Sequence, residues 1–307
     1  MRICIIGSGG VGGYFGGRLA AAGTEVAFVA RGAHLAALRA NGLRVESALG
    51  AVHVQPVEAT DDPKTLGPCD LVIIAVKLWG TADAIEASAA VMRERSAIVS
   101  LQNGVQAVRL LAERFGRERV LGGLAQISAL IESPGVIRHN GMLQRLVFGE
   151  LDGSRSARAE ALLAACLAAG IDAHLSDSIE RAIWEKFVFL VGLSATTTLT
   201  RCPLGPVREN PLTRALLLQV MSEAAALGRA RGVPLPEDSA ERQLAFMDTL
   251  PREMVASMLG DLRRGNPLEL EWLSGTVARD SDELGIPAPA NSFVRAALTL
   301  HAGGGGG

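Results

Sequence analysis

The stretch that decides the fold lies at the start of the chain and reads Ile3-Cys4-Ile5-Ile6-Gly7-Ser8-Gly9-Gly10-Val11-Gly12. Its apolar half predicts a buried strand, and the glycine-rich half opens an amphipathic helix expected over residues 12–22. A G-x-G-x-x-G pattern between a strand and a helix is typical of a dinucleotide-binding turn. In such a turn Gly7 allows the tight bend, Gly9 lets a pyrophosphate approach, and Gly12 lets the helix pack on the strand.

The whole turn is expected to bind the cofactor, because the first turn of a helix presents free N–H donors and a partial positive charge to a phosphate. The expected cofactor-binding residues of the turn are Gly7, Ser8, Gly9, Gly10, Val11 and Gly12. A glycine-rich turn without a ligand is the alternative, and the position of the motif between strand and helix disfavours it.

The organisation of the chain changes near residue 177. Before it, short apolar runs alternate with helical segments, which is typical of an α/β fold with a mostly parallel sheet. The expected strands are residues 2–6, 25–30, 71–75, 97–101, 120–126 and 142–148. Beyond it, apolar residues recur at helical spacing and no strand is expected. The prediction is therefore a Rossmann-type NADP-binding domain (1–177), an all-helical substrate and catalytic domain (178–302) and a flexible glycine tail (303–307).

Composition excludes several classes of protein. The chain has 307 residues, of which 49% are hydrophobic and 20% charged, so it folds around a sizeable core. Its net charge of −2 leaves no basic excess that would suggest binding to nucleic acid or to an anionic membrane. The four cysteines are far apart, which predicts reduced thiols and no metal site. The longest apolar run, residues 161–171, is too short to cross a bilayer, and no signal peptide is evident. We expect a cytoplasmic protein.

The second strand, expected over residues 25–30, indicates which dinucleotide binds. An NAD site usually carries an acidic residue at the end of this strand, where it accepts a hydrogen bond from the ribose 2′-OH. This chain has Arg31 there instead, and a guanidinium matches a 2′-phosphate in charge and geometry. The sequence therefore predicts NADP (NADPH), with a plain surface arginine as the alternative.

Two polar residues directly follow later strands. Lys77, in Val76-Lys77-Leu78-Trp79, is expected to face the ligand crevice and to add to the phosphate site. Asn103, in Gln102-Asn103-Gly104, is expected near the nicotinamide. A solvated loop lysine and an ordinary Asn-Gly turn are the alternatives, and spacing alone leaves them open.

The helical region carries three further candidates. Lys186 precedes seven apolar residues, so its ammonium either reaches the surface along its aliphatic stem or lies in a dry site. A dry site would lower its pKa toward neutrality, as a general acid at physiological pH needs. Ser257 and Glu269, taken singly, are ordinary polar residues of helices or loops.

Together these motifs resemble the ketopantoate reductase family (2-dehydropantoate 2-reductase) over nearly the full chain. The matching pieces, in the family's order, are Gly7-Ser8-Gly9-Gly10-Val11-Gly12, Val76-Lys77-Leu78-Trp79, Gln102-Asn103-Gly104, Trp184-Glu185-Lys186, Ser257-Met258-Leu259 and Glu269-Leu270-Glu271. The resemblance implies a Rossmann domain followed by a helical domain, with the active site in the cleft between them. It also implies NADPH-dependent reduction of ketopantoate to D-pantoate, a step toward pantothenate and coenzyme A.

The resemblance also implies roles for single residues. Lys186 would be the general acid that protonates the carbonyl oxygen as hydride arrives, and Glu269 would support both that lysine and substrate binding. Asn103 would help to place nicotinamide and substrate, and Ser257 would contact the substrate carboxylate. Arg31 and Lys77 would hold the 2′-phosphate.

The chain departs from the family on one helix face. Members commonly carry asparagines four and eight residues after the catalytic lysine, where this chain has Leu190 and Ser194. Leu190 makes that wall of the site apolar, while Ser194 and the threonines at 196, 197 and 198 are expected to compensate in part as substrate-binding groups. A wall lined by leucine discriminates weakly for a substrate hydroxyl.

Three functions remain open from the sequence. The first is 2-dehydropantoate 2-reductase, acting on a small 2-oxo acid. The second is an NADP-dependent reductase of the same fold that acts on a more apolar 2-oxo acid or related carbonyl compound. A non-catalytic NADP sensor ranks below both, because the proposed acid and its support are retained. Apolar helix faces in the second domain would permit a homodimer.

Overall fold

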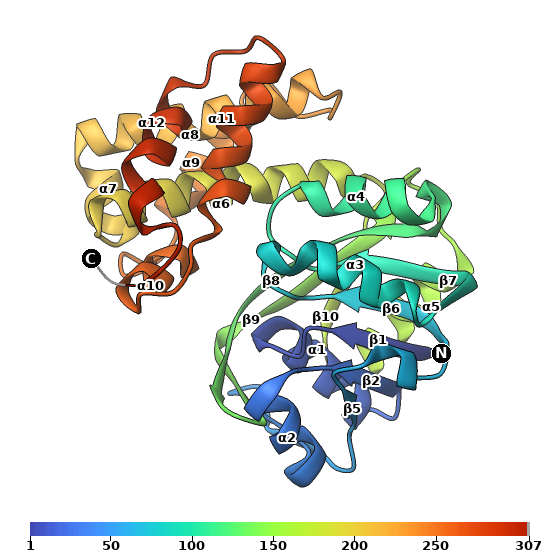
Figure 1. The fold of residues 1–307 in the computed structure, drawn as a ribbon. Coiled ribbons are helices and arrows are strands. Elements are labelled where there is room, and N and C mark those ends of the chain that lie inside the picture. Colours follow the sequence, from blue (N-terminus) through green and yellow to red (C-terminus); the bar gives the residue numbers. More distant parts are fainter. Residues whose placement is uncertain (306–307) are drawn as a thin grey trace. The chain divides into compact units, whose positions relative to one another are not determined.

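The computed structural model describes residues 1–305 (Figure 1). They form two compact units that divide between Ile179 and Glu180. The first unit contains the sheet and the second is helical, so the predicted α/β fold with a helical C-terminal region is confirmed.

The sheet of the first unit has ten strands, in the order β4-β3-β9-β8-β7-β6-β1-β2-β5, with β10 paired to β9. The strands are β1 Arg2–Ile6, β2 Glu25–Val29, β3 Leu43–Glu46, β4 Val52–Val54, β5 Glu58–Thr60, β6 Cys69–Ile74, β7 Met92–Ser100, β8 Val120–Ser133, β9 Val136–Glu150 and β10 Asp172–Leu175. Strand β1 is parallel to both neighbours, β6 and β2. Only the pairs β3–β4 and β8–β9 are antiparallel among the paired strands of the described residues. The sheet is therefore mostly parallel, as predicted.

Helices cover both faces of this sheet because its central strands are apolar on both sides. Ile3 and Ile5 pack with α1, α2 and α5, whereas Cys4 and Ile6 pack with α3 and α4. Figure 1 shows α3 and α4 together on one face. The helices are α1 Gly10–Ala21, α2 Gly32–Asn41, α3 Thr81–Ala89, α4 Gln106–Phe115 and α5 Ala157–Ala168, with 3₁₀ turns η1 Pro63–Thr65, η2 Leu78–Gly80 and η3 Arg117–Arg119.

The hairpin β8–β9 is longer than the sequence predicts. The expected strands covered residues 120–126 and 142–148, because polar residues interrupt the apolar pattern beyond them. The backbone ladder nevertheless continues to Ser133, which pairs with Val136 across a short turn. The strands β3, β4, β5 and β10 were not predicted, since runs of three or four residues carry little periodicity.

The second unit is built on the long helix α6, Ile179–Thr200. The other helices are α7 Leu204–Glu209, α8 Pro211–Ala230, α9 Ser239–Asp248, α10 Ser257–Arg263, α11 Ser274–Glu283 and α12 Pro289–Leu298, with 3₁₀ turns η4 Glu269–Trp272 and η5 Thr299–His301. Helix α6 is long and apolar enough to cross a membrane, but 67% of its most apolar stretch is buried in the protein. Most of this apolar stretch is therefore packed inside the protein, as in a core helix.

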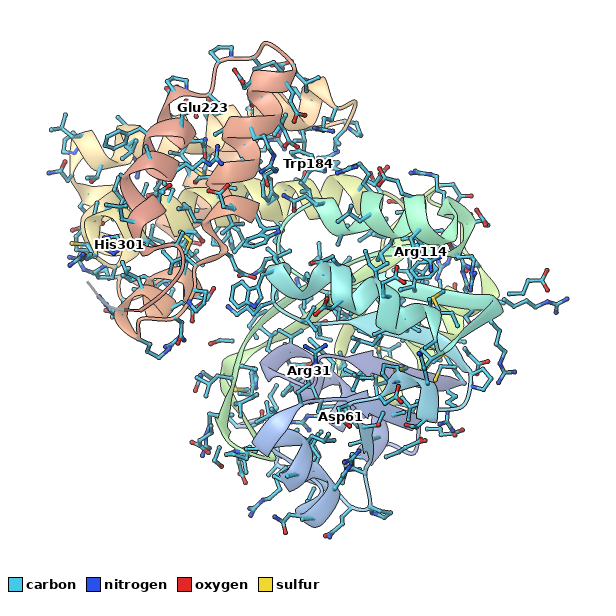
Figure 2. All side chains as sticks on the ribbon, in the orientation of Figure 1. Arg31, Asp61, Arg114, Trp184, Glu223 and His301 are labelled. Atoms are coloured by element: carbon cyan, nitrogen blue, oxygen red, sulfur yellow. The ribbon has the colours of Figure 1, made fainter. Side chains whose placement is uncertain are left out.

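A buried carboxylate fixes the packing of α12 on α8. Glu223, labelled in Figure 2, is 4% exposed and accepts hydrogen bonds from the backbone N–H groups of Ala290 and Asn291, both at 2.9 Å. These donors lie in the first turn of α12, where the helix leaves N–H groups unpaired. A negative charge at a helix N-terminus is stabilising, so the contact holds these two helices of the second unit together.

Candidate active site

The glycine-rich turn between β1 and α1 has the geometry of a phosphate cradle. Gly7 has a φ of +95°, and a Cβ there would lie 2.8 Å from the Val76 backbone nitrogen. A Cβ on Gly12 would overlap the Gly7 carbonyl oxygen. By contrast, nothing lies within 4 Å of a Cβ placed on Gly9. The first and last glycines therefore shape the turn, and the middle one leaves open space in front of the helix N-terminus.

At Gly10, the next glycine of the turn, close packing against another strand requires glycine. A Cβ on this residue would lie 2.5 Å from the Ala129 carbonyl carbon, so strand β8 runs directly against the start of α1. Ser8 is only 3% exposed, which turns its side chain away from solvent, and Val11 is half-buried. The turn is thus held between the sheet and the β8–β9 hairpin.

Two cations flank this turn at the carboxyl edge of the sheet. Arg31 and Lys77 follow β2 and β6, the two strands that pair with β1 on either side. The side chain of Arg31, labelled in Figure 2, is 75% exposed, and its Nη2 lies 3.8 Å from Asp83 Oδ2. An exposed ion pair of this kind contributes little, so Arg31 can exchange Asp83 for a phosphate at low cost. Lys77 Nζ lies 5.7 Å from the centre of the Trp79 ring.

Gln102 organises the ends of β6 and β7, and the sequence did not single it out as a site residue. Its Nε2 donates to the Val76 carbonyl at 3.1 Å and to Thr81 Oγ1 at 2.9 Å. Its Oε1 accepts from Ser100 Oγ at 3.1 Å. These bonds fix the loop that begins with Asn103, which is half-buried. Gln102 was missed because two of its partners, Val76 and Thr81, are more than 20 residues away in sequence.

In the second unit, α6 places Lys186 in a half-buried position where it interacts with Glu269. Burial lowers the pKa of Lys186 to about 8, because desolvation disfavours the ammonium. The carboxylate of Glu269, which is 5% exposed at the start of η4, acts in the opposite direction and raises that pKa. The lysine is therefore largely protonated at neutral pH and gives up its proton readily.

The α6 face beyond Lys186 is less polar than expected. Leu190 and Ser194 lie about one and two helical turns after Lys186. Leu190 is half-buried, and Ser194 is 3% exposed. Two of the threonines that are expected to compensate in part use their hydroxyl protons within the helix. Thr196 donates its hydroxyl to the Gly192 carbonyl at 2.8 Å, and Thr197 donates to the Leu193 carbonyl at 2.6 Å. These hydroxyl protons satisfy the helix backbone and are not free for a substrate.

The third of these threonines and Ser257 occupy different environments. The Thr198 hydroxyl is buried and makes no hydrogen bond to another described residue. Ser257 is exposed at the first position of α10. The residue before it, Ala256, donates its N–H to Thr197 Oγ1 at 3.4 Å, which ties the start of α10 to α6.

Residues 1–305 show neither a cluster of metal-ligating side chains nor a disulfide. No group of three or more His, Cys, Asp or Glu side chains within this range could hold a metal ion. The four cysteines, Cys4, Cys69, Cys166 and Cys202, are all free thiols, and the first three are buried.

Comparison with known proteins decides the family. The model of the family "Ketopantoate reductase PanE/ApbA" matches residues 3–153, and its C-terminal counterpart matches residues 178–302. The chain belongs to the ketopantoate reductase family. Among curated ketopantoate reductases, the 2-dehydropantoate 2-reductase of Mesorhizobium japonicum is 33% identical over 318 residues, covering 96% of each chain. The family assignment makes the protein an oxidoreductase that uses a nicotinamide dinucleotide, and the open space at Gly9 fits the pyrophosphate of such a cofactor.

Solved structures of ketopantoate reductases have the same fold. A PanE/ApbA family ketopantoate reductase from Ralstonia eutropha superposes with a TM-score of 0.88 at 33% identity, covering 98% of both chains. A D-mandelate dehydrogenase solved with NADH and anilino(oxo)acetate gives a TM-score of 0.89 at 19% identity, which shows a shared fold only. The uncharacterized oxidoreductase YkpB of Bacillus subtilis is also 33% identical, over 98% of this chain.

Proposed function

We propose that the protein reduces 2-dehydropantoate (ketopantoate) to D-pantoate with NADPH, a step toward pantothenate and coenzyme A. The observation that carries this proposal is the environment of Lys186, together with the family assignment. A lysine with a pKa of about 8 is a suitable general acid near neutral pH.

Lys186 would act on the carbonyl oxygen, and Glu269 would act on the protonation of Lys186. Bound NADPH supplies a hydride from nicotinamide C4 to the ketone carbon, and the carbonyl oxygen gains negative charge as that bond forms. The Lys186 ammonium stabilises this charge and donates a proton to the oxygen, which completes the hydroxyl group. Glu269 keeps the lysine protonated, because its carboxylate opposes the lowering of the lysine pKa by burial.

The choice of NADPH over NADH rests on Arg31 and Lys77. Both follow strands that flank β1, and no acidic residue takes the place of Arg31 at the end of β2. The guanidinium would bind the 2′-phosphate, and the ammonium would add to the same anionic site. Residues 7–12 would hold the pyrophosphate at the start of α1.

The substrate side of the site would be formed by Asn103, Ser194 and Ser257. Asn103 would orient nicotinamide and substrate, and Ser257 would bind the substrate carboxylate. Ser194, which is 3% exposed two helical turns after Lys186, would offer a hydroxyl group to the substrate.

A second candidate function follows from Leu190. This side chain offers neither a donor nor an acceptor for a hydroxyl group, and two neighbouring threonines bond to their own helix. Such a wall favours a 2-oxo acid with an apolar side chain over one with a hydroxymethyl end.

The experiment that separates the two is steady-state oxidation of NADPH, and separately of NADH, with ketopantoate and a panel of 2-oxo acids. The first proposal predicts the highest kcat/KM for ketopantoate with NADPH. A higher kcat/KM for a branched or aromatic 2-oxo acid supports the second. Binding of NADPH without reduction of any of these compounds would contradict both.

A further inference from the structure

One histidine joins the dinucleotide-binding turn to the β8–β9 hairpin. His34 lies in the first turn of α2 and is half-buried. Its Nε2 lies 2.9 Å from the Ser8 carbonyl oxygen, inside the turn. Its Nδ1 accepts a hydrogen bond at 3.1 Å from the backbone N–H of Gly135, at the tip of the hairpin. The imidazole thus bridges two segments that the chain separates by more than a hundred residues.

These two partners determine the protonation state of the ring. The Ser8 carbonyl can only accept, so the hydrogen must be on Nε2. The Gly135 N–H can only donate, so Nδ1 must carry its lone pair. The neutral Nε2–H tautomer is therefore the only form that makes both bonds. A protonated ring would place an N–H against the Gly135 N–H and lose that bond.

The bond to Ser8 controls the direction of the next backbone donor. The C=O of Ser8 and the N–H of Gly9 belong to one planar trans peptide and point in opposite directions. A carbonyl held by His34 therefore aims the Gly9 N–H away from the imidazole. Gly9 is the position where a Cβ would meet nothing within 4 Å, which is the open side of the turn.

We infer that His34 is a positioning residue for the dinucleotide, which it serves in its neutral form by locking the Ser8–Gly9 peptide against the hairpin. The inference rests on the proposed binding of a pyrophosphate at this turn. Burial lowers the pKa of His34 below its ordinary value of 6.5, and the bond to the Ser8 carbonyl opposes that shift. The neutral form therefore predominates above about pH 6.5, and the lock is lost as the pH falls through the lowered pKa.

The charged and titratable side chains near His34 in the fold have partners of their own. The turn of residues 7–12 has no titratable side chain. Besides His34, the charged or titratable side chains on residues 31–41 and on residues 130–140 of the hairpin are Arg31, Arg39, Glu132, Arg138 and His139. The three arginines pair with Asp83, Asp61 and Glu132, respectively. His139 is 4% exposed and its two ring nitrogens bond to Ser47 Oγ and the Leu143 carbonyl.

The test measures the dissociation constant of NADP⁺, which is stable in acid, by calorimetry between about pH 5 and pH 8 for three variants and the wild type. His34→Ala removes both bonds. His34→Gln replaces the ring by a carboxamide that can donate and accept without titrating. His53→Ala is the matched control, because His53 is exposed in the same unit and also bonds to a backbone carbonyl, that of Asn41.

We expect His34→Ala to bind NADP⁺ about tenfold more weakly at pH 8, the equivalent of one or two ordinary hydrogen bonds. The ratio of its dissociation constant to that of the wild type should fall as the pH drops, because protonation of His34 removes the bond to Gly135 in the wild type. His34→Gln should restore affinity at pH 8 and keep it in acid better than the wild type. The 2′-phosphate also titrates near pH 6, but it does so in every variant and cancels in the ratio.

Amide hydrogen exchange without cofactor separates this inference from the proposed function. The Gly135 amide should exchange faster in His34→Ala than in the wild type or His53→Ala, whichever dinucleotide the protein prefers. Unchanged exchange, or equal NADP⁺ affinity of His34→Ala and wild type, would overturn the inference. Faster exchange in a protein that binds no dinucleotide would instead contradict the proposed function.

Discussion

The substitution Gly9→Ala should weaken cofactor binding without lowering the stability of the fold. Gly9 has φ −71° and ψ −159°, which alanine adopts without strain. A Cβ at this position would meet nothing within 4 Å of the protein. The added methyl group would therefore lie in the space where a pyrophosphate must approach the N-terminus of α1.

The structure sets the size of the expected effect. A methyl group in front of the turn would lengthen or break the hydrogen bonds from backbone N–H groups to the phosphate. Hydrogen bonds to a charged group contribute about 1.5–3 kcal/mol, so losing one weakens binding about 10- to 150-fold. The free energy of unfolding should stay the same or rise by about 0.4–1 kcal/mol, because alanine restricts the unfolded chain more than glycine does.

The assay is calorimetric or fluorescence titration with NADPH, combined with thermal unfolding without cofactor. Gly67→Ala is the matched control, since a Cβ there also meets nothing within 4 Å and its φ is not positive. The control should bind NADPH as the wild type does. If Gly9→Ala bound NADPH within twofold of the control, the assignment of this turn as the pyrophosphate site would be refuted.

The remaining predictions concern the reacting lysine, the phosphate site and the substrate wall. Lys186→Ala should lower kcat about 10²- to 10⁴-fold, and the wild-type kcat for reduction should fall as the pH rises through about 8, where the ammonium is lost; a flat pH–rate profile would contradict this assignment. Arg31→Ala should weaken NADPH about tenfold and leave NADH unchanged in parallel titrations, whereas equal losses would exclude a 2′-phosphate contact. Leu190→Asn should raise kcat/KM for ketopantoate relative to an apolar 2-oxo acid, and no change in that ratio would show that Leu190 does not contact the substrate.

Local sequence was sufficient for the parts of the site that depend on neighbouring residues. The strand, glycine turn and helix of residues 3–22 follow one another in the chain, so spacing alone predicted this strand, turn and helix. The seven apolar residues after Lys186 left open whether its ammonium reaches the surface or lies in a dry site, and the family resemblance singled it out. Its pKa could not be predicted in the same way, because the opposing charge of Glu269 comes from η4.

Hydrogen bonds and strand pairing that the order of residues does not reveal account for what the sequence did not predict. His34 acts through Gly135, 101 residues away, and nothing in its immediate sequence indicates that partner. The hydroxyls of Thr196 and Thr197 were expected to face a substrate, but side-chain rotation on a helix lets them bond to carbonyls four residues earlier. The full length of the β8–β9 hairpin is likewise set by pairing between its strands, where polar residues face outward and hide the pattern.

The most direct test of the central claim follows the hydride and the proton donor together. The protein is incubated with ketopantoate and NADPH that carries deuterium at the transferable C4 position, and pantoate is analysed by mass spectrometry over time. We predict pantoate with a single deuterium at C2, formed at least about 100-fold more slowly by Lys186→Ala than by the wild type. Wild-type protein that forms no deuterated pantoate, or a Lys186→Ala variant that forms it at the wild-type rate, would contradict the account.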